Sequence, residues 1–393
     1  MNKKISLGAA LAMLVLVAAT AVFITMAVSM QMFNTDSSEI GNRTENIAKI
    51  TEIDKVVRDN YVGQIDEDKL TIGIADGYFK GLDDPHSYYL SADEYTDILN
   101  YRTGKSNEIG AYVTDNGDSG LYVYFVMSNS PASKAGMQDG DTITAISGRA
   151  IAEIGVEQAT EELKSITQPV DITVMREGVE LTLQINPEQF AYTTIEAIVM
   201  EDIGYIRIYD FIDSTSDQFI DAVETMLKQN VRGFIFDVRH NSGGTLSSVV
   251  DMIDRLCPAG DIVSKTDKNG VTTVMHKSDA KEVNLPMIVL VDEETASAAE
   301  LFACALRDYD KAELVGVQTY GKGSMQELFP FKDGSAINLT TALYNPPKSP
   351  NYDGVGITPD HEVELNPAPA NFYMMTENED TQLQYALAYF MQQ

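Results

Sequence analysis

The segment Phe234-Ile-Phe-Asp-Val-Arg-His-Asn-Ser-Gly-Gly244 begins with a short apolar run and ends in a glycine turn. Apolar residues at helical spacing follow over 245–256, so the sequence predicts a buried strand, a tight turn and a helix in succession. The order recurs downstream, where the apolar run Met287–Val291 precedes a helical pattern over 297–307 and a further strand over Glu313–Val317. This alternation predicts a mixed α/β domain with parallel strand pairs.

Three loops of this domain are expected to share one edge of the sheet. Parallel strands present their carboxyl ends at the same edge, and ligands usually bind among the loops that leave them. The loop 239–244 contains glycines whose backbone N–H groups can hold an oxyanion, and the loop 292–297 ends in Ser297 at a helix start. The third loop, 318–323, carries Lys322 between two glycines. The sequence therefore predicts an active site at this edge.

Ser297 and Lys322 have the chemistry of a hydrolase dyad. A serine nucleophile needs a base, and a lysine can act as one when burial lowers its pKa from about 10.4 and leaves it neutral. One helix and one strand separate the two residues, so a βαβ crossover can bring them together, and the helix N-terminus favours a developing negative charge. Two simpler interpretations stay open. Ser297 and Glu300 also form a capping-box pattern, and Gly-Lys-Gly is common in solvated turns.

Separate modules are expected before and after this domain. Helical spacing over 46–60, 67–80 and 91–101 indicates a small N-terminal helical module. Short apolar alternations between Gly, Asp and Asn turns over 106–190, with one helical segment among them, indicate a compact β-rich module. An amphipathic helix ends the chain.

The beginning of the chain predicts export. The run from Ile5 to Phe33 contains no charged residue, and it is longer than the ~20 residues that span a bilayer or the shorter apolar core of a cleaved signal peptide. We therefore expect a single-pass anchor in the cell membrane, with the catalytic part outside the cytoplasm. Cleavage of a signal peptide after Ser29 is the alternative.

Composition excludes several kinds of partner and site. The 393 residues carry 28 Lys and Arg against 59 Asp and Glu, and the resulting formal charge of −31 repels nucleic acid. The two cysteines, Cys257 and Cys304, fit neither a zinc site nor a disulfide framework, and the four histidines are scattered. A metal site is not expected.

The motifs in these loops resemble those of the carboxyl-terminal processing peptidases, also called tail-specific proteases, and the resemblance covers nearly everything after the N-terminal apolar run. The similar segments are Gly81-Leu-Asp-Asp-Pro-His-Ser-Tyr-Tyr-Leu90, Ser130-Pro-Ala-Ser-Lys-Ala-Gly136, Asp237-Val-Arg-His-Asn-Ser-Gly-Gly244, Thr295-Ala-Ser-Ala-Ala-Glu300, Thr319-Tyr-Gly-Lys-Gly-Ser-Met-Gln326 and Gly354-Val-Gly-Ile-Thr-Pro-Asp360. Several ordered motifs at compatible spacing are far more specific than any one of them.

By this resemblance Ser297 is the catalytic serine, Lys322 is the general base, and Gln326 orients the lysine. The backbone amides of Gly243 and Ala298 are expected to form the oxyanion hole. No cofactor is required for such chemistry.

The resemblance implies an α/β fold with a crotonase-like catalytic core, an inserted β-rich PDZ domain and an N-terminal helical module. A PDZ domain binds an extended chain end by strand addition, and Ile109, Gly110 and Ala111 are the expected capture loop, although ordinary turn residues explain that tripeptide equally well. The expected domains are an anchor or signal segment over 1–36, the helical module over 37–103, the PDZ domain over 104–190, the peptidase core over 191–370 and a C-terminal helix over 371–393.

The predicted function is an exported serine endopeptidase that recognises and cleaves C-terminal or unstructured tails of proteins. Its expected partners are such protein substrates and, through the N-terminal helix, the membrane, and a homo-oligomer is implied by family analogy alone. Two alternatives stay open, a catalytically silent membrane-anchored PDZ scaffold and a hydrolase of small esters or amides. Glu294 favours the scaffold because it replaces the family's usual glycine and is expected to bring negative charge near Lys322, which would raise the lysine pKa.

Overall fold

The N-terminal part of the chain forms a unit of its own. The computed structural model divides into two compact units, residues 1–73 and residues 74–393. Within the first, a helix spans residues 43–60, and Arg58 pairs with Asp54 and with Glu67. The residues that the structure describes are 13, 17, 20, 21, 24–26, 43–106, 108–117, 120–369 and 371–391.

The apolar side chains of the helix over 43–60 face solvent. Ile47, Ile53 and Val56 are 57%, 55% and 58% exposed, so the expectation that one face of this helix is buried is wrong. The prediction rests on helical spacing alone. Spacing shows that apolar residues share one face of a helix, but it does not show that another element covers that face.

The expected membrane anchor is not supported. Among the described residues, no helix is both long enough and apolar enough to cross a bilayer. This finding overturns the prediction of a single-pass membrane protein. Most of the run from Ile5 to Phe33, from which that prediction was made, lies outside the described residues.

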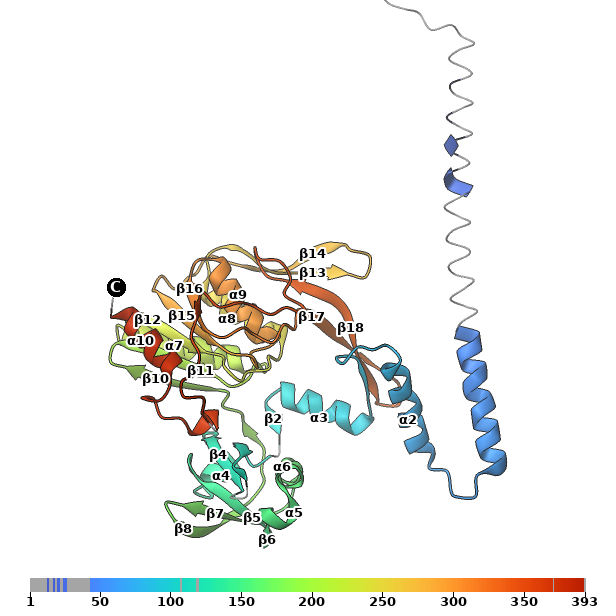
Figure 1. The fold of residues 1–393 in the computed structure, drawn as a ribbon, viewed down its shortest axis with the longest axis horizontal. Helices are drawn as coiled ribbons and strands as arrows, with labels where there is room; N and C mark the ends of the chain where they lie inside the picture. Colours follow the sequence, from blue (N-terminus) through green and yellow to red (C-terminus); the bar gives the residue numbers. More distant parts are fainter. Residues whose placement is uncertain are drawn as a thin grey trace, which may run out of the picture. The chain divides into compact units, whose positions relative to one another are not determined.

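A six-stranded sheet forms the centre of the second unit (Figure 1). Every neighbouring pair in it is parallel except the first, which is an antiparallel hairpin. The prediction of a mixed α/β domain with parallel pairs is confirmed. In order across the sheet, its strands are β10 (Ile195–Met200), β11 (Ile203–Ile208), β12 (Gly233–Asp237), β15 (Met287–Val291), β16 (Ala312–Gly316) and β19 (His361–Glu362).

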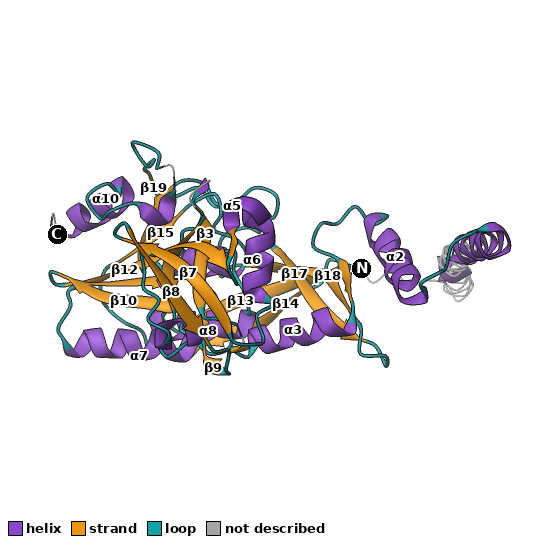
Figure 2. Ribbon diagram, turned by 90° about the horizontal axis from the view of Figure 1, so that it is seen from below, coloured by secondary structure: helices purple, strands orange, loops and turns teal. Residues whose placement is uncertain are grey.

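Helices cover both faces of this sheet, as Figure 2 shows. Phe234 and Phe236 of β12 point to one face and pack in a core with α7 (Thr215–Lys228), α8 (Leu246–Leu256) and α9 (Ala298–Asp308). Ile235, between them in the strand, points to the other face and packs against α10 (Thr381–Phe390). The alternation follows from the two-residue period of a strand. On the first of these faces, α8 and α9 begin directly after two of the three predicted loops.

A second sheet stands beside the first and extends toward α3 (Figure 1). This sheet joins the motif Gly81–Leu90 to the motif Thr319–Gln326. One edge of β18 pairs antiparallel with β1, and its other edge pairs with β17. Helix α3 (Ala92–Arg102) follows β1 directly. The strands are β1 (Tyr88–Leu90), β13 (Gly260–Asp267), β14 (Thr272–Ser278), β17 (Ser324–Pro330) and β18 (Ala336–Asn345).

The β-rich module is a third sheet, inserted between α3 and β10. The chain enters and leaves it side by side, because β2 (Lys105–Ser106) pairs antiparallel with β9 (Phe190–Ala191). Its sheet order is β3-β4-β5-β7-β8, with β6 paired to β5. The strands are β3 (Ala111–Asp115), β4 (Leu121–Val126), β5 (Thr142–Ile146), β6 (Arg149–Ala150), β7 (Val170–Arg176) and β8 (Val179–Ile185), and the helices are α4 (Pro131–Lys134), α5 (Ile151–Ile154) and α6 (Val156–Lys164).

Candidate active site

The three predicted loops converge at the carboxyl ends of β12, β15 and β16, which are adjacent in the sheet. A cavity of about 610 Å³ lies there, and Ser297, Ala298, Lys322 and Gln326 all contribute to its wall. The structure therefore brings together the predicted nucleophile, base and orienting amide, which the sequence separates by as many as two secondary-structure elements.

Ser297 has a backbone conformation that few residues adopt. It precedes the first residue of α9, and its φ of 56° and ψ of −117° place it in a region that is unfavourable for a side chain with a Cβ atom. The Glu300 carboxylate accepts the Ser297 backbone N–H at 2.9 Å, which is one half of a capping box. The capping interaction and a strained backbone at Ser297 therefore occur together here.

The glycine turn packs directly against the serine. A Cβ atom on Gly243 would lie 2.7 Å from the Ser297 Cβ and 2.9 Å from the Ala298 nitrogen, so only glycine fits. The Gly243 N–H, however, donates to the Asn241 side-chain oxygen at 2.8 Å. In this arrangement the predicted oxyanion donor is already occupied. Ala298, the first residue of α9, has an N–H that the helix does not use for its own hydrogen bonds.

Lys322 is a half-buried lysine held by its backbone. Its N–H donates to Glu300 at 2.8 Å and its carbonyl accepts the Tyr344 hydroxyl at 2.6 Å. Burial lowers the Lys322 pKa below its ordinary value, although the charges of Asp84 and Glu300 oppose the change. Within the described part of the chain, no carboxylate forms an ion pair with its ammonium group. The direction of this pKa change is the one that a neutral lysine base requires.

Glu300 joins the two catalytic loops. Its buried carboxylate accepts four hydrogen bonds, from the backbone N–H groups of Ser297, Gly321 and Lys322 and from the Thr319 hydroxyl. Burial raises the Glu300 pKa, and these hydrogen bonds oppose the rise. Because this one carboxylate binds both loops, it holds the backbone of Lys322 in a defined position relative to the backbone of Ser297.

Gln326 lies on β17 at the wall of the same cavity. Its amide nitrogen donates to the hydroxyls of Ser324 and Thr340, both at 3.1 Å. These are its hydrogen bonds in the described structure, and neither reaches Lys322 directly.

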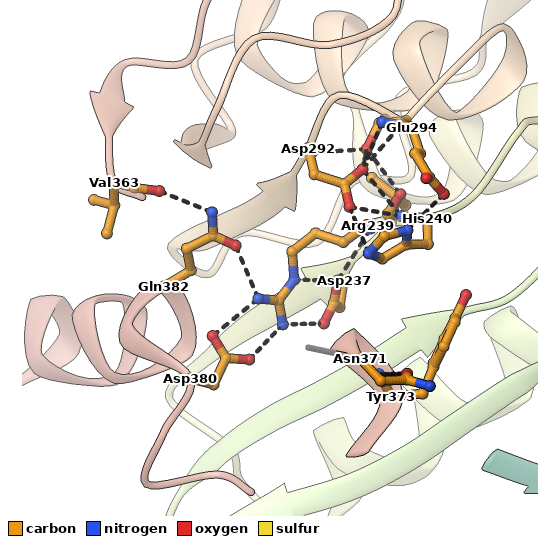
Figure 3. A network of polar contacts seen from close by, with 12 residues as sticks. Asp237, Arg239, His240, Asp292, Glu294, Val363, Asn371, Tyr373, Asp380 and Gln382 are labelled. Carbon is orange, nitrogen blue, oxygen red and sulfur yellow. Dashed lines mark hydrogen bonds and ion pairs between the residues drawn. The ribbon is translucent and has the colours of Figure 1, made fainter. Parts of the chain in front are cut away.

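Glu294 does not act as the sequence suggested. Figure 3 shows its carboxylate turned toward His240, whose Nδ1 lies 2.6 Å from the Glu294 oxygen. The charges that raise the Lys322 pKa are those of Asp84 and Glu300 instead. His240 has a positive φ of 57°, and its ring lies beside both the Glu294 carboxylate and the Phe372 ring. The expected effect of Glu294 on Lys322 is therefore wrong.

A buried ion cluster supports the loop that carries Gly243 (Figure 3). The Arg239 guanidinium, 1% exposed, pairs with Asp237 at the end of β12 and with Asp380 beside α10. It also donates to Gln382, whose own amide donates to the Val363 carbonyl. The C-terminal segment thereby fixes the start of the glycine loop.

Comparison with known proteins identifies the chain. Residues 202–363 match peptidase family S41, residues 99–175 match the PDZ domain, and residues 7–94 match the N-terminal domain of the activating protease CtpB. A carboxy-terminal-processing protease of Bartonella bacilliformis is 31% identical over 342 residues, which cover 84% of this chain and 78% of that relative. The chain belongs to the carboxy-terminal-processing proteases of peptidase family S41.

A further relative and two solved structures are similar to this S41 protease. A probable CtpA-like serine protease of Staphylococcus aureus is 31% identical over 331 residues, covering 82% of this chain and 66% of that protein. The photosystem II D1 C-terminal processing protease has a similar fold, with a TM-score of 0.50 and 24% identity over 80% of this chain and 86% of that one. A putative S41 protease from Bacteroides fragilis has a TM-score of 0.57 and 17% identity over 84% of this chain and 91% of that one. The predicted fold class is confirmed.

The predicted peptide-capture residues of this S41 protease lie in the PDZ domain, outside the catalytic cavity. Ile109 is buried, and Gly110 has a φ of 76° with its backbone pressed against Ser130. Ala111 begins β3, which pairs only with β4 and therefore lies at the edge of its sheet. An edge strand is the place where an added peptide strand can pair.

Sequence reasoning missed several residues around the cavity. Arg102 of α3 and Tyr88 of β1 contribute to its wall, and Asp84 acts on Lys322 from the turn before β1. The motif Gly81–Leu90 is part of the family resemblance, and this resemblance is the sequence signal that indicates a role at the site. Nothing in the sequence pattern showed that it pairs with β18.

Proposed function

We propose that this S41 protease is a serine endopeptidase that uses a Ser297–Lys322 dyad to cleave C-terminal or unstructured tails of proteins. The observation that carries the proposal is the shared cavity. Its wall contains both a half-buried lysine, which has no ion pair among the described residues, and a serine at a strained helix start. The common bond of both loops to Glu300 supports it further.

The proposed reaction begins with neutral Lys322. Its nitrogen takes the proton of the Ser297 hydroxyl while the serine oxygen forms a bond to the scissile carbonyl carbon. The carbonyl oxygen becomes an oxyanion, which the N–H groups of Ala298 and Gly243 stabilise. For this step the Gly243 N–H must exchange the Asn241 oxygen for the oxyanion. Protonated Lys322 then gives its proton to the leaving amine, and the C–N bond breaks.

The second half of the reaction repeats the same proton transfers. The acyl group is now bound to Ser297, and neutral Lys322 takes a proton from a water molecule as that water attacks the ester. Collapse of the second oxyanion breaks the bond to the serine oxygen, which regains its proton from Lys322. Gln326, through hydrogen bonds to Ser324 and Thr340, keeps its part of the cavity wall in place.

Substrate recognition is assigned to the PDZ domain. A protein tail would add to the free edge of β3, with its terminal carboxylate at Ile109, Gly110 and Ala111. The expected domain boundaries, with the PDZ domain over 104–190 and the peptidase core over 191–370, are part of this proposal. So is export, in which the uncharged run from Ile5 to Phe33 acts as the signal. A homo-oligomer stays a prediction that sedimentation of the purified protein would test.

The test is cleavage of an unfolded protein, with released peptides identified by mass spectrometry. Ser297→Ala and Lys322→Ala are compared with two matched controls. Ser247→Ala removes another exposed hydroxyl from the wall of the same cavity, and Lys332→Ala removes an exposed lysine. We expect cleavage by the wild type and both controls and none by the two dyad variants.

Two outcomes would contradict the proposal. Cleavage that persists in Ser297→Ala and Lys322→Ala would exclude this dyad. Absence of cleavage across a pH series, with retained binding of tail peptides to the PDZ domain, would instead favour the silent scaffold.

A further inference from the structure

The loop that follows β11, residues 209–214, is bonded to the end of α3. The backbone N–H of Asp213 donates to the carbonyl of Arg102, the last residue of that helix, at 3.0 Å. Both residues contribute to the wall of the catalytic cavity. One part of this loop therefore borders the cavity beside α3.

Another part of the loop is bonded to the glycine turn that packs against Ser297. The Phe211 N–H donates to the Gly243 carbonyl at 3.1 Å, and the Phe211 carbonyl accepts the Thr245 N–H at 2.6 Å. Between these two bonds, a Cβ atom on Gly244 would lie 2.1 Å from the Phe211 carbonyl oxygen, so the two backbones are in direct contact. A displacement of Phe211 therefore moves the turn that carries Gly243.

Asp210 precedes Phe211 and accepts three hydrogen bonds. One oxygen of its carboxylate accepts the Phe211 N–H at 2.7 Å, and the other accepts the hydroxyl of Tyr101 on α3. Its backbone carbonyl accepts the Thr215 hydroxyl at 3.0 Å. The carboxylate thus joins α3 to the residue that holds the glycine turn, although Tyr101 and Asp210 lie 109 positions apart in the sequence.

The hydrogen-bond partners of the Asp210 carboxylate are uncharged. The titratable and charged groups on the elements that meet at this loop are Tyr101 and Arg102 on α3, Tyr192 after β9, Arg207 on β11, Asp217 on α7, and Tyr209 and Asp213 in the loop itself. None of these charged residues forms an ion pair with Asp210. Burial raises the Asp210 pKa to about 7, and the hydrogen bond from the Phe211 N–H opposes the rise. The carboxylate therefore changes its charge near neutral pH.

We propose that Asp210 is a positioning residue for the oxyanion hole: its ionised carboxylate holds Phe211, and with it the Gly243 turn, in place. An ionised carboxylate accepts hydrogen bonds more strongly than a protonated one, so protonation loosens this connection. The inference rests on the proposed Ser297–Lys322 dyad and adds a second ionisation to it, because the active enzyme then needs both a neutral Lys322 and a charged Asp210. Asp210 touches neither the substrate nor the reacting atoms.

The experiment measures kcat and KM across pH, with an acetylated peptide that the wild type cleaves and that contains no histidine, so that the substrate does not titrate near neutral pH. Asp210→Asn keeps an oxygen that can accept the Phe211 N–H and has no proton to lose. Tyr101→Phe removes the hydroxyl that binds the carboxylate and leaves Asp210 titratable. The matched controls are Asp221→Asn, an exposed carboxylate on α7, and Tyr95→Phe, a second tyrosine of α3. Circular dichroism and thermal unfolding establish that each variant is folded.

For the wild type, we expect a plot of log kcat/KM against pH to approach a slope of about 2 at its acid end, where Asp210 and Lys322 are both protonated, and a slope of about 1 between their two pKa values. Asp210→Asn has a slope of about 1 throughout, because only the lysine titrates. Its kcat at the plateau is lower by about fivefold, with little change in KM, because the oxyanion hole acts in the transition state. Tyr101→Phe keeps the change of slope but shows it at higher pH, since the carboxylate has lost a donor that favours its charged form. Both controls behave as the wild type.

The inference is overturned if Asp210→Asn and the wild type have the same slope at the acid end, even where the activity of the variant is lower, because a purely structural role would lower the plateau alone. A change of slope at the same pH in Tyr101→Phe and the wild type would overturn the part played by α3, and this arm remains informative if Asp210→Asn does not fold. Failure of the dyad is recognised separately, by cleavage that survives Ser297→Ala or Lys322→Ala.

Discussion

A single carboxylate oxygen of Glu300 accepts the backbone N–H of Lys322 at 2.8 Å and, at 2.9 Å, that of Ser297 as well. The loops after β15 and β16 therefore share one buried acceptor. Since the sheet places these two strands side by side, the loops are already neighbours, and Glu300 turns that proximity into a defined geometry.

The first prediction concerns this shared acceptor. Glu300→Gln keeps the size of the side chain but replaces one acceptor oxygen by an N–H₂ group that faces backbone donors. We expect the free energy of unfolding to fall by about 1–3 kcal/mol and kcat to fall more than KM changes. Urea unfolding and steady-state kinetics measure both. Glu153→Gln, on an exposed position of the PDZ domain, is the control, and an equal effect in the two variants would contradict the role of Glu300.

The second prediction concerns backbone strain at Ser297. Its φ of 56° and ψ of −117° suit glycine better than any residue with a Cβ atom. Glycine already exceeds alanine by about 1 kcal/mol at an unstrained helix N-cap, so Ser297→Gly is expected to be more stable than Ser297→Ala by more than that amount. Denaturant unfolding of the two inactive variants measures the difference. A less stable glycine variant would show that the turn is not strained.

The third prediction is the pH dependence of cleavage. Burial lowers the Lys322 pKa, and the active form is the neutral amine, so kcat/KM rises with pH and reaches a plateau once the lysine has lost its proton. The midpoint is expected below about 10.4, the value of an exposed lysine. Lys322→Arg is expected to be inactive at every pH because a guanidinium stays protonated. Activity that falls as pH rises would contradict a lysine base.

The fourth prediction concerns acid stability. Burial on its own would raise the pKa of Asp237, but Arg239 and its other partners outweigh it and hold the pKa at about 2. A lowered carboxylate pKa stabilises the fold above the unfolded value of about 3.9, and this contribution is lost as pH falls toward 2. We expect the free energy of unfolding of Asp237→Asn to be lower than that of the wild type by about 3 kcal/mol or more at neutral pH. This difference in unfolding free energy is expected to shrink below pH 4. Urea unfolding across pH tests this against the exposed Asp221→Asn, whose effect should be small and constant.

Much of the catalytic domain could be predicted because its signals are local. The apolar runs that became β12, β15 and β16 alternate with helical segments, and parallel strands must present their loops at one edge. That rule alone placed Ser297 near Lys322. The helices that follow β12 and β15 are indicated by equally local patterns, the apolar spacing over 245–256 and 297–307.

The contribution of the N-terminal turn could not be predicted in the same way. The bond from Asn338 to His86 joins residues 252 positions apart, and a pairing of that range leaves no periodic trace in the sequence. The sequence shows the segment Gly81–Leu90 only as part of the family resemblance. The register of β1 against β18 brings this segment to the cavity, where Tyr88 contributes to the wall.

Side-chain direction explains the two remaining differences. Glu294 was expected to bring negative charge near Lys322, but its carboxylate lies against the His240 ring instead. Gly243 was expected to offer a free N–H, and the Asn241 side chain occupies it. Both outcomes depend on rotation about single bonds within loops, where sequence spacing carries no information.

The most direct test of the central claim is to trap the acyl-enzyme. The protein is mixed with an ester of a tail peptide and quenched in acid within the first turnover, and its proteolytic fragments are weighed by mass spectrometry. The proposed mechanism predicts that the acyl mass is found on the fragment that contains Ser297, and that Ser297→Ala and Lys322→Ala do not acquire it. An acyl group on another residue, or full cleavage activity with the acyl mass still formed in Ser297→Ala, would contradict the assignment of Ser297 as the nucleophile.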